Sequence, residues 1–456
     1  MGLNLRFMKN ITVKKGLYLI LALALFLRVA AFISYESWEP KEKDARVLKY
    51  DAEQYDLLAR SLLEGHYNGN AFWAPGYPVY VSAVYAVFGT HPWVVLLTHC
   101  LIGTLSVWLI FLIGRDIFSA KTGLIAALLM AVEPHQILYT QVFYTETLFI
   151  AVFLGSSYFI LRFMRDEKLL YLIFSAIFLA FAVYIRPAGN YLFVVWSIVL
   201  IYRFYKNWRQ ALKFVLTLNV LILLVMSPWF YRNYTLHGNF GHTTNGGYNI
   251  LYVFAASIYE NQYGIEKEVV LDSLWREVQR SGKDISNPFI LDQVENEIGM
   301  RIIKDHPVEY MVNHFYGSTN IYLSLSTNLL AVVLQIPDEI LIKPKGSMHF
   351  SHIDDFIEAK APSLLFGGLL ILLFLLFTYT LGIKGGINLY RDDRKVELLL
   401  FVLIILYFTL IIGPLGSSVR FKLPLTPFYL LMAAYAIGKI RTALKEGLSV
   451  KDAILK

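Results

Sequence analysis

The chain has 456 residues, of which 57% are hydrophobic and 16% are charged, and its mean hydropathy is +0.52. Soluble globular domains carry about 25% charged residues, so the excess apolar surface is expected to face lipid. The net charge of +7 would suit nucleic acid, but the basic residues lie between apolar segments and predict no nucleic-acid partner. A single cysteine, Cys100, excludes a disulfide framework and a thiol metal site.

Ten apolar segments are predicted to cross the membrane as helices, because a span needs about 20 predominantly apolar residues. The first follows a basic N-terminal stretch and resembles a secretory signal, but its length and the spans behind it predict an uncleaved helix. The segments are residues 16–35, 93–114, 123–139, 142–163, 169–185, 189–205, 212–231, 364–383, 398–412 and 423–440. The sequence therefore predicts an all-α integral membrane fold, with residues 1–456 forming one polytopic domain.

Basic residues concentrate in one set of short connections between these segments. If the N-terminus is cytoplasmic, an even number of spans places all of these connections and the C-terminal tail in the cytoplasm, as the positive-inside rule requires. The residues are Arg115, Lys121, Arg162, Arg165, Lys168, Arg203, Lys206, Arg209, Lys213, Lys384, Arg391, Arg394 and Lys395. Both termini are therefore predicted to be cytoplasmic.

The same topology places two long connections, residues 36–92 and 232–362, on the extracytoplasmic side. In the first, residues 51–65 have apolar side chains at helical spacing, whereas residues 73–89 are broken by proline and glycine. Both stretches are expected to lie along the membrane surface.

The second long connection begins with a turn rich in glycine and asparagine at residues 245–249. A helix is predicted over residues 292–305, ending before Pro307. Residues 322–342 are compatible with a loop and with an excursion into the bilayer. No internal repeat is evident, which argues against the inverted repeats of many transporters.

Two acids begin the amphipathic stretch of the first long connection. Asp51 and Glu53 lie where substrate and water both have access, so a carboxylate here can accept the proton of an attacking hydroxyl. The alternative is a solvated acid at a helix start, which complements the helix dipole. Position alone leaves both interpretations open.

Three ionisable residues flank the short outer connection near residue 140. Glu146 begins an apolar segment, so its carboxylate is expected at the membrane boundary, where a helix N-terminus would also stabilise it. Glu133 and His135 precede it, and His135 is interpreted as a hydrogen-bonded residue rather than a metal ligand, because no second His or Cys stands at ligand spacing. No metal site is predicted, although outer acids leave a divalent ion open.

Arginines at three outer helix ends are unexpected under the positive-inside rule. Arg186, Arg232 and Arg420 together favour a phosphate-binding pocket, because guanidinium groups bind phosphate bidentately. For each arginine alone, snorkelling to lipid headgroups explains the position equally well. Arg28, inside the first apolar segment, is interpreted as structural.

These outer residues stand in an ordered series of short motifs. The motifs are 51–59 with Gly65, 74–78, 88–89, 145–149, 186–187, 228–234 with Gly238 and 245–249, 304–307, and 420–424. Each motif alone is common, but the set resembles bacterial polyprenyl-phosphate-dependent glycosyltransferases related to protein O-mannosyltransferases and to the lipid A aminoarabinose transferase. The resemblance covers nearly the whole chain.

The resemblance implies a C-type glycosyltransferase fold with interfacial helices in the first outer connection. It makes Asp51 the expected base and Glu53 its competitor, because relatives carry the two acids adjacent whereas Ala52 separates them here. Glu146 resembles the second carboxylate of the family. The expected ligands of the donor phosphate are Arg232, Arg420, Arg186 and Lys422, and the expected site-lining residues are Tyr55, Tyr77, Glu133, His135 and Asn233.

The function that the resemblance implies is inverting transfer of a monosaccharide from a polyprenyl-phosphate donor, such as an undecaprenyl-phosphate sugar, to an acceptor hydroxyl. The acceptor is a glycolipid, a polysaccharide or a protein, and no cofactor is expected. The expected location is the bacterial inner membrane, with the site on the extracytoplasmic face. Two alternatives are a transporter or flippase of a lipid-linked or anionic substrate, and a ligase that moves an oligosaccharide from a lipid pyrophosphate.

Overall fold

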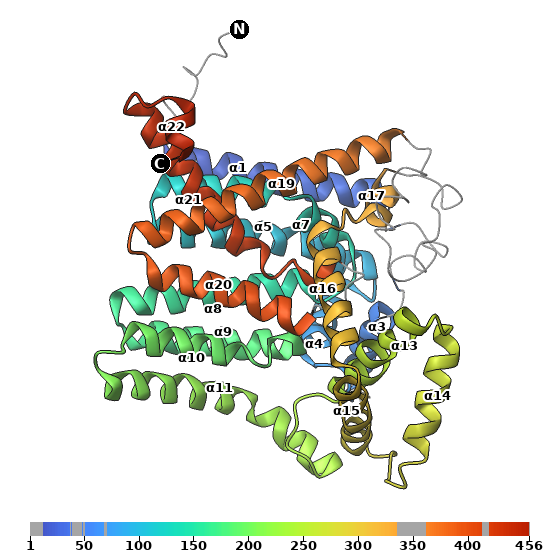
Figure 1. The fold of residues 1–456 in the computed structure, drawn as a ribbon. Helices are drawn as coiled ribbons and strands as arrows, with labels where there is room; N and C mark the ends of the chain where they lie inside the picture. Colours follow the sequence, from blue (N-terminus) through green and yellow to red (C-terminus); the bar gives the residue numbers. More distant parts are fainter. Residues whose placement is uncertain are drawn as a thin grey trace.

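The protein is a bundle of long helices with a smaller helical layer at one end (Figure 1). The computed structural model describes residues 12–36, 38, 48, 51–67, 71–334, 362–412 and 419–455, and these contain no strand. A helix overlaps each of the ten apolar segments: α1 Val13–Tyr35, α5 Pro92–Ile117, α6 Ala120–Val132, α8 Glu146–Asp166, α9 Leu169–Ile185, α10 Leu192–Arg203, α11 Trp208–His237, α19 Pro362–Arg391, α20 Lys395–Ile412 and α21 Thr426–Lys445. The predicted all-α membrane architecture is confirmed.

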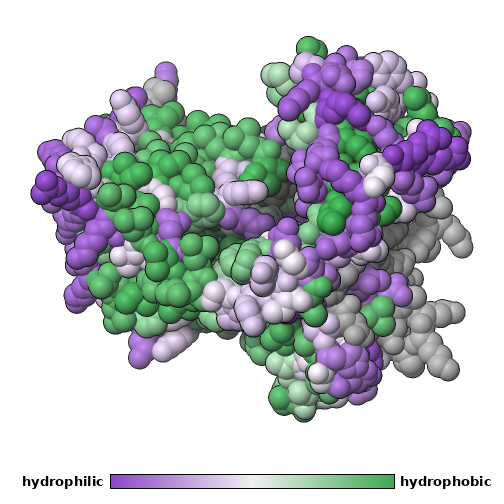
Figure 2. Space-filling model, turned by 90° about the horizontal axis from the view of Figure 1, so that it is seen from below, coloured by the Kyte–Doolittle hydropathy of each residue, from purple (hydrophilic) through white to green (hydrophobic). Residues whose placement is uncertain are grey.

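The long helices carry apolar side chains on their outer surface as well as in the core. Five of them, α1, α5, α8, α11 and α19, are long and apolar enough to span a membrane. α11 is largely unburied along its apolar stretch, with Leu216, Leu223 and Leu224 more than half exposed. Figure 2 shows the resulting apolar band, with hydrophilic surface at both ends of the molecule. Such a band is what a lipid-facing bundle requires.

The predicted span 123–139 is shorter in the structure than the sequence indicates. α6 ends at Val132, and the short helix α7, Pro134–Leu138, begins directly after Glu133. Pro134 cannot donate a backbone hydrogen bond, so it interrupts the first helix and is tolerated as the first residue of the next. Glu133 caps α7 by accepting from the amide of Gln136 at 2.6 Å.

The first long connection contains two helices, α3 Asp51–Leu63 and α4 Gly76–Phe88. α3 confirms the amphipathic helix predicted there. α4 is a correction, because the segment expected to be broken by proline and glycine is a regular helix that starts after Pro75. Gly76 lies against the backbone of α9, where an added Cβ would stand 2.7 Å from the carbonyl carbon of Tyr184. The absence of a side chain at Gly76 therefore allows close helix packing rather than a turn.

The described part of the second long connection folds into a small helical layer. Its helices are α12 Gly246–Tyr248, a π-helix at Asn249–Ala255, α13 Ala256–Tyr263, α14 Lys267–Gln279, α15 Pro288–Asp305, α16 Pro307–Leu323 and α17 Thr327–Val333. The helix predicted at 292–305 is confirmed within α15, and the turn predicted at 245–249 lies in α12 and the start of the π-helix. Of the segment 322–342, residues 335–342 lie outside the described chain.

Candidate active site

Four charged residues from four connections meet at the end of the bundle that carries α3 and α4. Asp51 is the first residue of α3, Glu146 is the first residue of α8, and Arg186 directly follows α9. Arg420 lies in the 3-10 turn Val419–Phe421 before α21. We call these residues the outer charge cluster, after the membrane side that the sequence predicts for this end.

The arginines of the outer charge cluster bridge its two carboxylates. Arg420 Nη1 donates to Asp51 Oδ2 at 2.9 Å, and Arg420 Nε lies 3.9 Å from Glu146 Oε1. Arg186 Nη1 donates to the same Glu146 oxygen. Two positive and two negative groups therefore form one continuous, formally neutral unit.

The two carboxylates differ in their access to solvent. The side chain of Glu146 is 2% exposed and that of Arg186 is 8% exposed, whereas those of Asp51 and Arg420 are 31% and 26% exposed. Glu146 Oε2 is buried without a hydrogen-bond partner in the described chain. Burial lowers the pKa of Arg420, but Glu146 and Asp51 outweigh it and hold that pKa above its ordinary value. Asp51 is therefore the more accessible of the two carboxylates.

Aromatic rings enclose the outer charge cluster. The ring of Phe421 lies 5.4 Å from the guanidinium of Arg186 and 4.8 Å from that of Arg420, which also lies 5.2 Å from the ring of Tyr144. Sequence reasoning missed both rings as site residues. The available signal was adjacency, because Phe421 follows Arg420 and Tyr144 comes two residues before Glu146.

Tyr55, one turn after Asp51 on α3, links the cluster to further aromatic residues. Its ring packs edge-on against Trp73 at 5.1 Å and against Tyr77 at 4.9 Å. Burial, and then the charges of Asp51 and Glu146, raise the pKa of Tyr55. Tyr77 is fully buried, with its hydroxyl 3.3 Å from His99 Nε2. Tyr55 therefore borders the cluster, whereas Tyr77 supports it from behind.

Glu53 does not join the outer charge cluster. Two residues along a helix rotate a side chain by roughly 200°, so Glu53 leaves the face that carries Asp51 and Tyr55. Its side chain is exposed and makes no hydrogen bond or ion pair within the described chain.

Arg232 and Asn233 lie near the end of α11. The guanidinium of Arg232 lies over Tyr67 at 5.4 Å and over Trp229 at 4.7 Å, and it donates to Asn233 Oδ1 at 2.8 Å. Asn233 is buried and donates to the carbonyl of Gly241 at 2.8 Å. The Tyr67 hydroxyl in turn donates to the carbonyl of Trp73, the residue that packs on Tyr55. A chain of aromatic contacts, from Tyr67 through Trp73 to Tyr55, thus connects Arg232 with the border of the outer charge cluster.

Lys422, which directly follows the Arg420 turn, lies near Glu133 and His135 in a second polar group. All three are fully buried. Lys422 Nζ lies 3.4 Å from the carbonyl of Tyr322, and His135 Nδ1 lies 2.9 Å from Glu133 Oε1. Burial lowers the pKa of Lys422 to about 8, against the opposing charge of Glu133. This group fastens the chain after Arg420 to α7 and the end of α16, because Gln136 also donates to the carbonyl of Leu423 at 3.0 Å.

No group of three or more His, Cys, Asp or Glu side chains is arranged to hold a metal ion in the part of the chain that the structure describes. The outer charge cluster consists of carboxylates and guanidinium groups. Such a set can accept a proton at Asp51 and bind a phosphate at the cations.

Comparison with known proteins agrees with the resemblance. Residues 73–231 match the family model for dolichyl-phosphate-mannose-protein mannosyltransferases. A putative mannosyltransferase, YycA of Bacillus subtilis (strain 168), is 28% identical over 177 residues, which is 35% of this chain and 24% of that protein. The alignment thus spans about a quarter of the curated relative. The predicted relation to glycosyltransferases of the protein O-mannosyltransferase type is confirmed for this region, which includes Glu146 and Arg186 but not Asp51 or Arg420.

Two solved structures are similar over nearly all of this chain. The oligosaccharyltransferase of Archaeoglobus fulgidus has 12% sequence identity and a TM-score of 0.49, covering 95% of this chain and 54% of that one. ArnT of Cupriavidus metallidurans bound to undecaprenyl phosphate has 14% identity and a TM-score of 0.41, covering 94% of this chain and 79% of that one.

Proposed function

We propose that the protein is an inverting glycosyltransferase that moves a monosaccharide from a polyprenyl-phosphate donor to an acceptor hydroxyl at the extracytoplasmic membrane face. The observation that carries the proposal is the outer charge cluster, in which a solvent-accessible carboxylate, Asp51, is held by Arg420 beside the buried pair of Glu146 and Arg186. The match of residues 73–231 to a mannosyltransferase family supports it.

In the proposed reaction, Asp51 accepts the proton of the acceptor hydroxyl as its oxygen attacks the anomeric carbon of the donor sugar. The bond from that carbon to the phosphate oxygen breaks on the opposite side, and its electron pair leaves with the polyprenyl phosphate. A single displacement of this kind inverts the anomeric configuration. The reaction needs an accessible base, and the 31% exposure of Asp51 meets that need.

Arg420 is the proposed ligand of the donor phosphate. Its Nη1 donates to Asp51, whereas Nη2 has no partner in the described chain and is available to a phosphate oxygen. Charge that develops on the leaving phosphate would be stabilised by this guanidinium. Glu146, held by Arg186, is proposed to orient Arg420 rather than to take a proton, because it is almost completely buried.

The remaining predicted phosphate ligands take different proposed roles. Arg232 is proposed to contact the donor on the α11 side of Tyr67. Lys422 is proposed to position the Arg420 turn, since its ammonium group is fully buried against Tyr322 and Tyr379.

The proposal is tested by incubating the purified full chain in detergent with a radiolabelled polyprenyl-phosphate sugar and candidate acceptors. The expected result is release of polyprenyl phosphate together with a glycosylated product of inverted configuration. Transport of an intact donor would leave the glycosyl phosphate bond unbroken and contradict the proposal. Turnover of only a lipid-pyrophosphate oligosaccharide would replace it with the ligase alternative.

A further inference from the structure

A cavity of about 160 Å³ lies at the end of the bundle opposite the outer charge cluster. It is bordered by the C-terminal ends of α5, α8 and α10 and by the start of α20. Glu146 begins α8 and Arg162 lies near its end, so the two sites are roughly 24 Å apart along this helix at about 1.5 Å per residue. We call this cavity the inner cavity.

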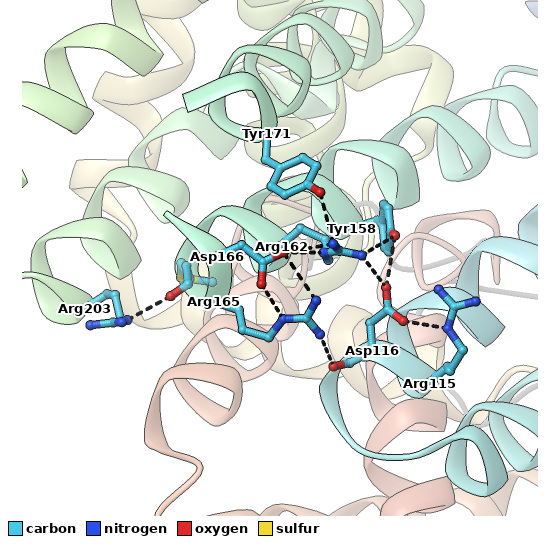
Figure 3. A network of polar contacts seen from close by, with 9 residues as sticks. Arg115, Asp116, Tyr158, Arg162, Arg165, Asp166, Tyr171 and Arg203 are labelled. Carbon is cyan, nitrogen blue, oxygen red and sulfur yellow. Dashed lines mark hydrogen bonds and ion pairs between the residues drawn. The ribbon is translucent and has the colours of Figure 1, made fainter. Parts of the chain in front are cut away.

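One wall of the inner cavity is a hydrogen-bonded frame whose groups are already used (Figure 3). Asp116 accepts from Arg115 at 2.6 Å, from Arg162 at 2.9 Å and from Tyr158 at 3.0 Å. Arg162 also donates to Asp166 at 2.8 Å. Since these groups satisfy one another, the frame shapes the cavity without needing a ligand.

Two arginines on the rim of the inner cavity keep donors free. Arg203 donates through Nε to the carbonyl of Met164 at 3.1 Å and through Nη2 to Glu167 at 3.3 Å, and Arg394 donates through Nη1 to Glu397 at 3.3 Å. Within the described chain, Arg203 Nη1 and Arg394 Nε and Nη2 have no partner. Their side chains are 35% and 45% exposed, so the ion pairs of Arg203 with Glu167 and of Arg394 with Glu397 are weak. An anion can therefore replace the water at these guanidinium groups.

The rest of the inner cavity is apolar. Ile117, Leu161, Met164 and Val396 line it beside the arginines. The charged lining consists of four arginines and two carboxylates, so it is positive overall. Guanidinium donors beside an apolar wall, at the end of a membrane helix bundle, match a lipid that carries a phosphate on an apolar chain.

We propose that the inner cavity binds the phosphate headgroup of an anionic membrane lipid, with the phosphate bridging Arg203 and Arg394 and the chain lying on the apolar wall. The phosphate would replace water at the free guanidinium donors. The planar guanidinium groups of Arg203 and Arg394 come from two different parts of the chain and can bind the phosphate oxygens together. The site concerns neither the acceptor nor the donor sugar, so it stands independently of the proposed function.

The first test uses the unaltered, delipidated full chain in detergent and the arginine reagent phenylglyoxal. Mixed micelles with phosphatidylglycerol are expected to slow modification of Arg203 and Arg394 several-fold, measured by peptide mass spectrometry, whereas phosphatidylcholine and inorganic phosphate leave the rates unchanged. Equal protection by phosphatidylcholine would overturn a site for anionic lipids. Equal protection by inorganic phosphate would overturn a lipid as the occupant.

The second test compares two double variants that each remove two positive charges from the same end of the bundle. Arg203→Gln with Arg394→Gln changes the inner cavity, whereas Arg209→Gln with Arg441→Gln changes exposed arginines outside it. Native mass spectrometry is expected to show about tenfold weaker phosphatidylglycerol binding in the cavity variant, since charge-assisted hydrogen bonds are lost. Binding in the control variant should stay within about twofold of the unaltered chain. An equal loss in both would overturn the proposal, because it would reflect general surface charge.

Discussion

Arginines pair with carboxylates at both ends of α8, and the two groups differ in burial and in how they are assembled. In the outer charge cluster, Glu146 is 2% exposed and its partners come from connections far apart in the chain, including Arg186 and Arg420. At the inner cavity, Asp116 and Asp166 are 11% and 21% exposed and both pair with Arg162, which lies 46 residues from Asp116, whereas 369 residues separate Asp51 from Arg420 in the outer charge cluster.

This difference suggests that the outer charge cluster is suited to catalysis, whereas the frame at the inner cavity is suited to stabilising the fold. Burying an ion pair costs desolvation energy that its attraction often only offsets, so the outer charge cluster is weak as a stabilising device. It holds groups that a reaction can use. The inner frame lies near water and is internally satisfied, so each of its pairs is expected to contribute modestly to stability and not to turnover.

The largest effect is expected from Arg420→Gln in the outer charge cluster. Removing the guanidinium that holds Asp51 and faces the proposed phosphate should lower glycosyl transfer by about 10²- to 10³-fold, as loss of a transition-state donor commonly does. Arg420→Lys should recover little activity, because an ammonium lacks the planar fork. Steady-state turnover and donor affinity measure both. Full activity of Arg420→Gln would remove the phosphate role.

Glu146→Gln is expected to lower stability as well as activity. The nearly buried Arg186 would lose its counter-charge, and breaking a buried pair costs about 3 kcal/mol. Thermal unfolding in detergent measures the loss. The double variant Glu146→Gln with Arg186→Gln should regain part of the stability without regaining activity, and recovery of both would show that the pair is only structural.

Asp116→Asn at the inner frame should leave glycosyl transfer unchanged. Stability should fall by about 1 kcal/mol, because Arg115 and Arg162 keep other partners or solvent. The same unfolding and turnover assays apply. A loss of activity comparable to that of Arg420→Gln would break the contrast between the two ends.

A smaller, pH-dependent effect is expected from Glu295 on α15. Burial, and then the charge of Asp292, raise the pKa of Glu295 from its ordinary value of 4.5 to about 7. The folded protein therefore holds more protons than the unfolded chain between these values, so this residue's contribution to stability falls as the pH rises from 4.5 to 7. Glu295→Gln should flatten that slope in melting temperatures measured across this range. An unchanged slope would exclude Glu295 as its source.

The positions of the long apolar helices could be predicted from apolar length, because lipid imposes that length on a helix that spans it. The break between α6 and α7 was missed although Glu133 and Pro134 were visible, since the apolar residues on both sides suggested continuity. The proline and glycine pattern failed to indicate α4, because Gly76 serves close packing against Tyr184 and not a turn, and only the family resemblance implied helices in this connection.

The candidate site could not be predicted from apolar length, because its residues come from separate connections. Periodicity cannot bring Asp51 to Arg420. The assignment of both motifs to one membrane side, together with the family resemblance, predicted that they share an end. Their contact comes from tertiary packing. That side assignment could not separate Arg232 from the cluster or show that Lys422 is buried, because both depend on side-chain direction within an end. The catalytic roles stay predictions.

The central claim is that Asp51 takes the proton of the acceptor hydroxyl. It is tested most directly by measuring turnover and donor binding on the same preparation of Asp51→Asn, with Glu53→Gln as the matched control on the exposed face of α3. Turnover should fall by about 10²- to 10⁴-fold in Asp51→Asn while donor binding persists, since only the base is lost. Both quantities should stay near normal in Glu53→Gln. Near-normal turnover of Asp51→Asn would contradict the account.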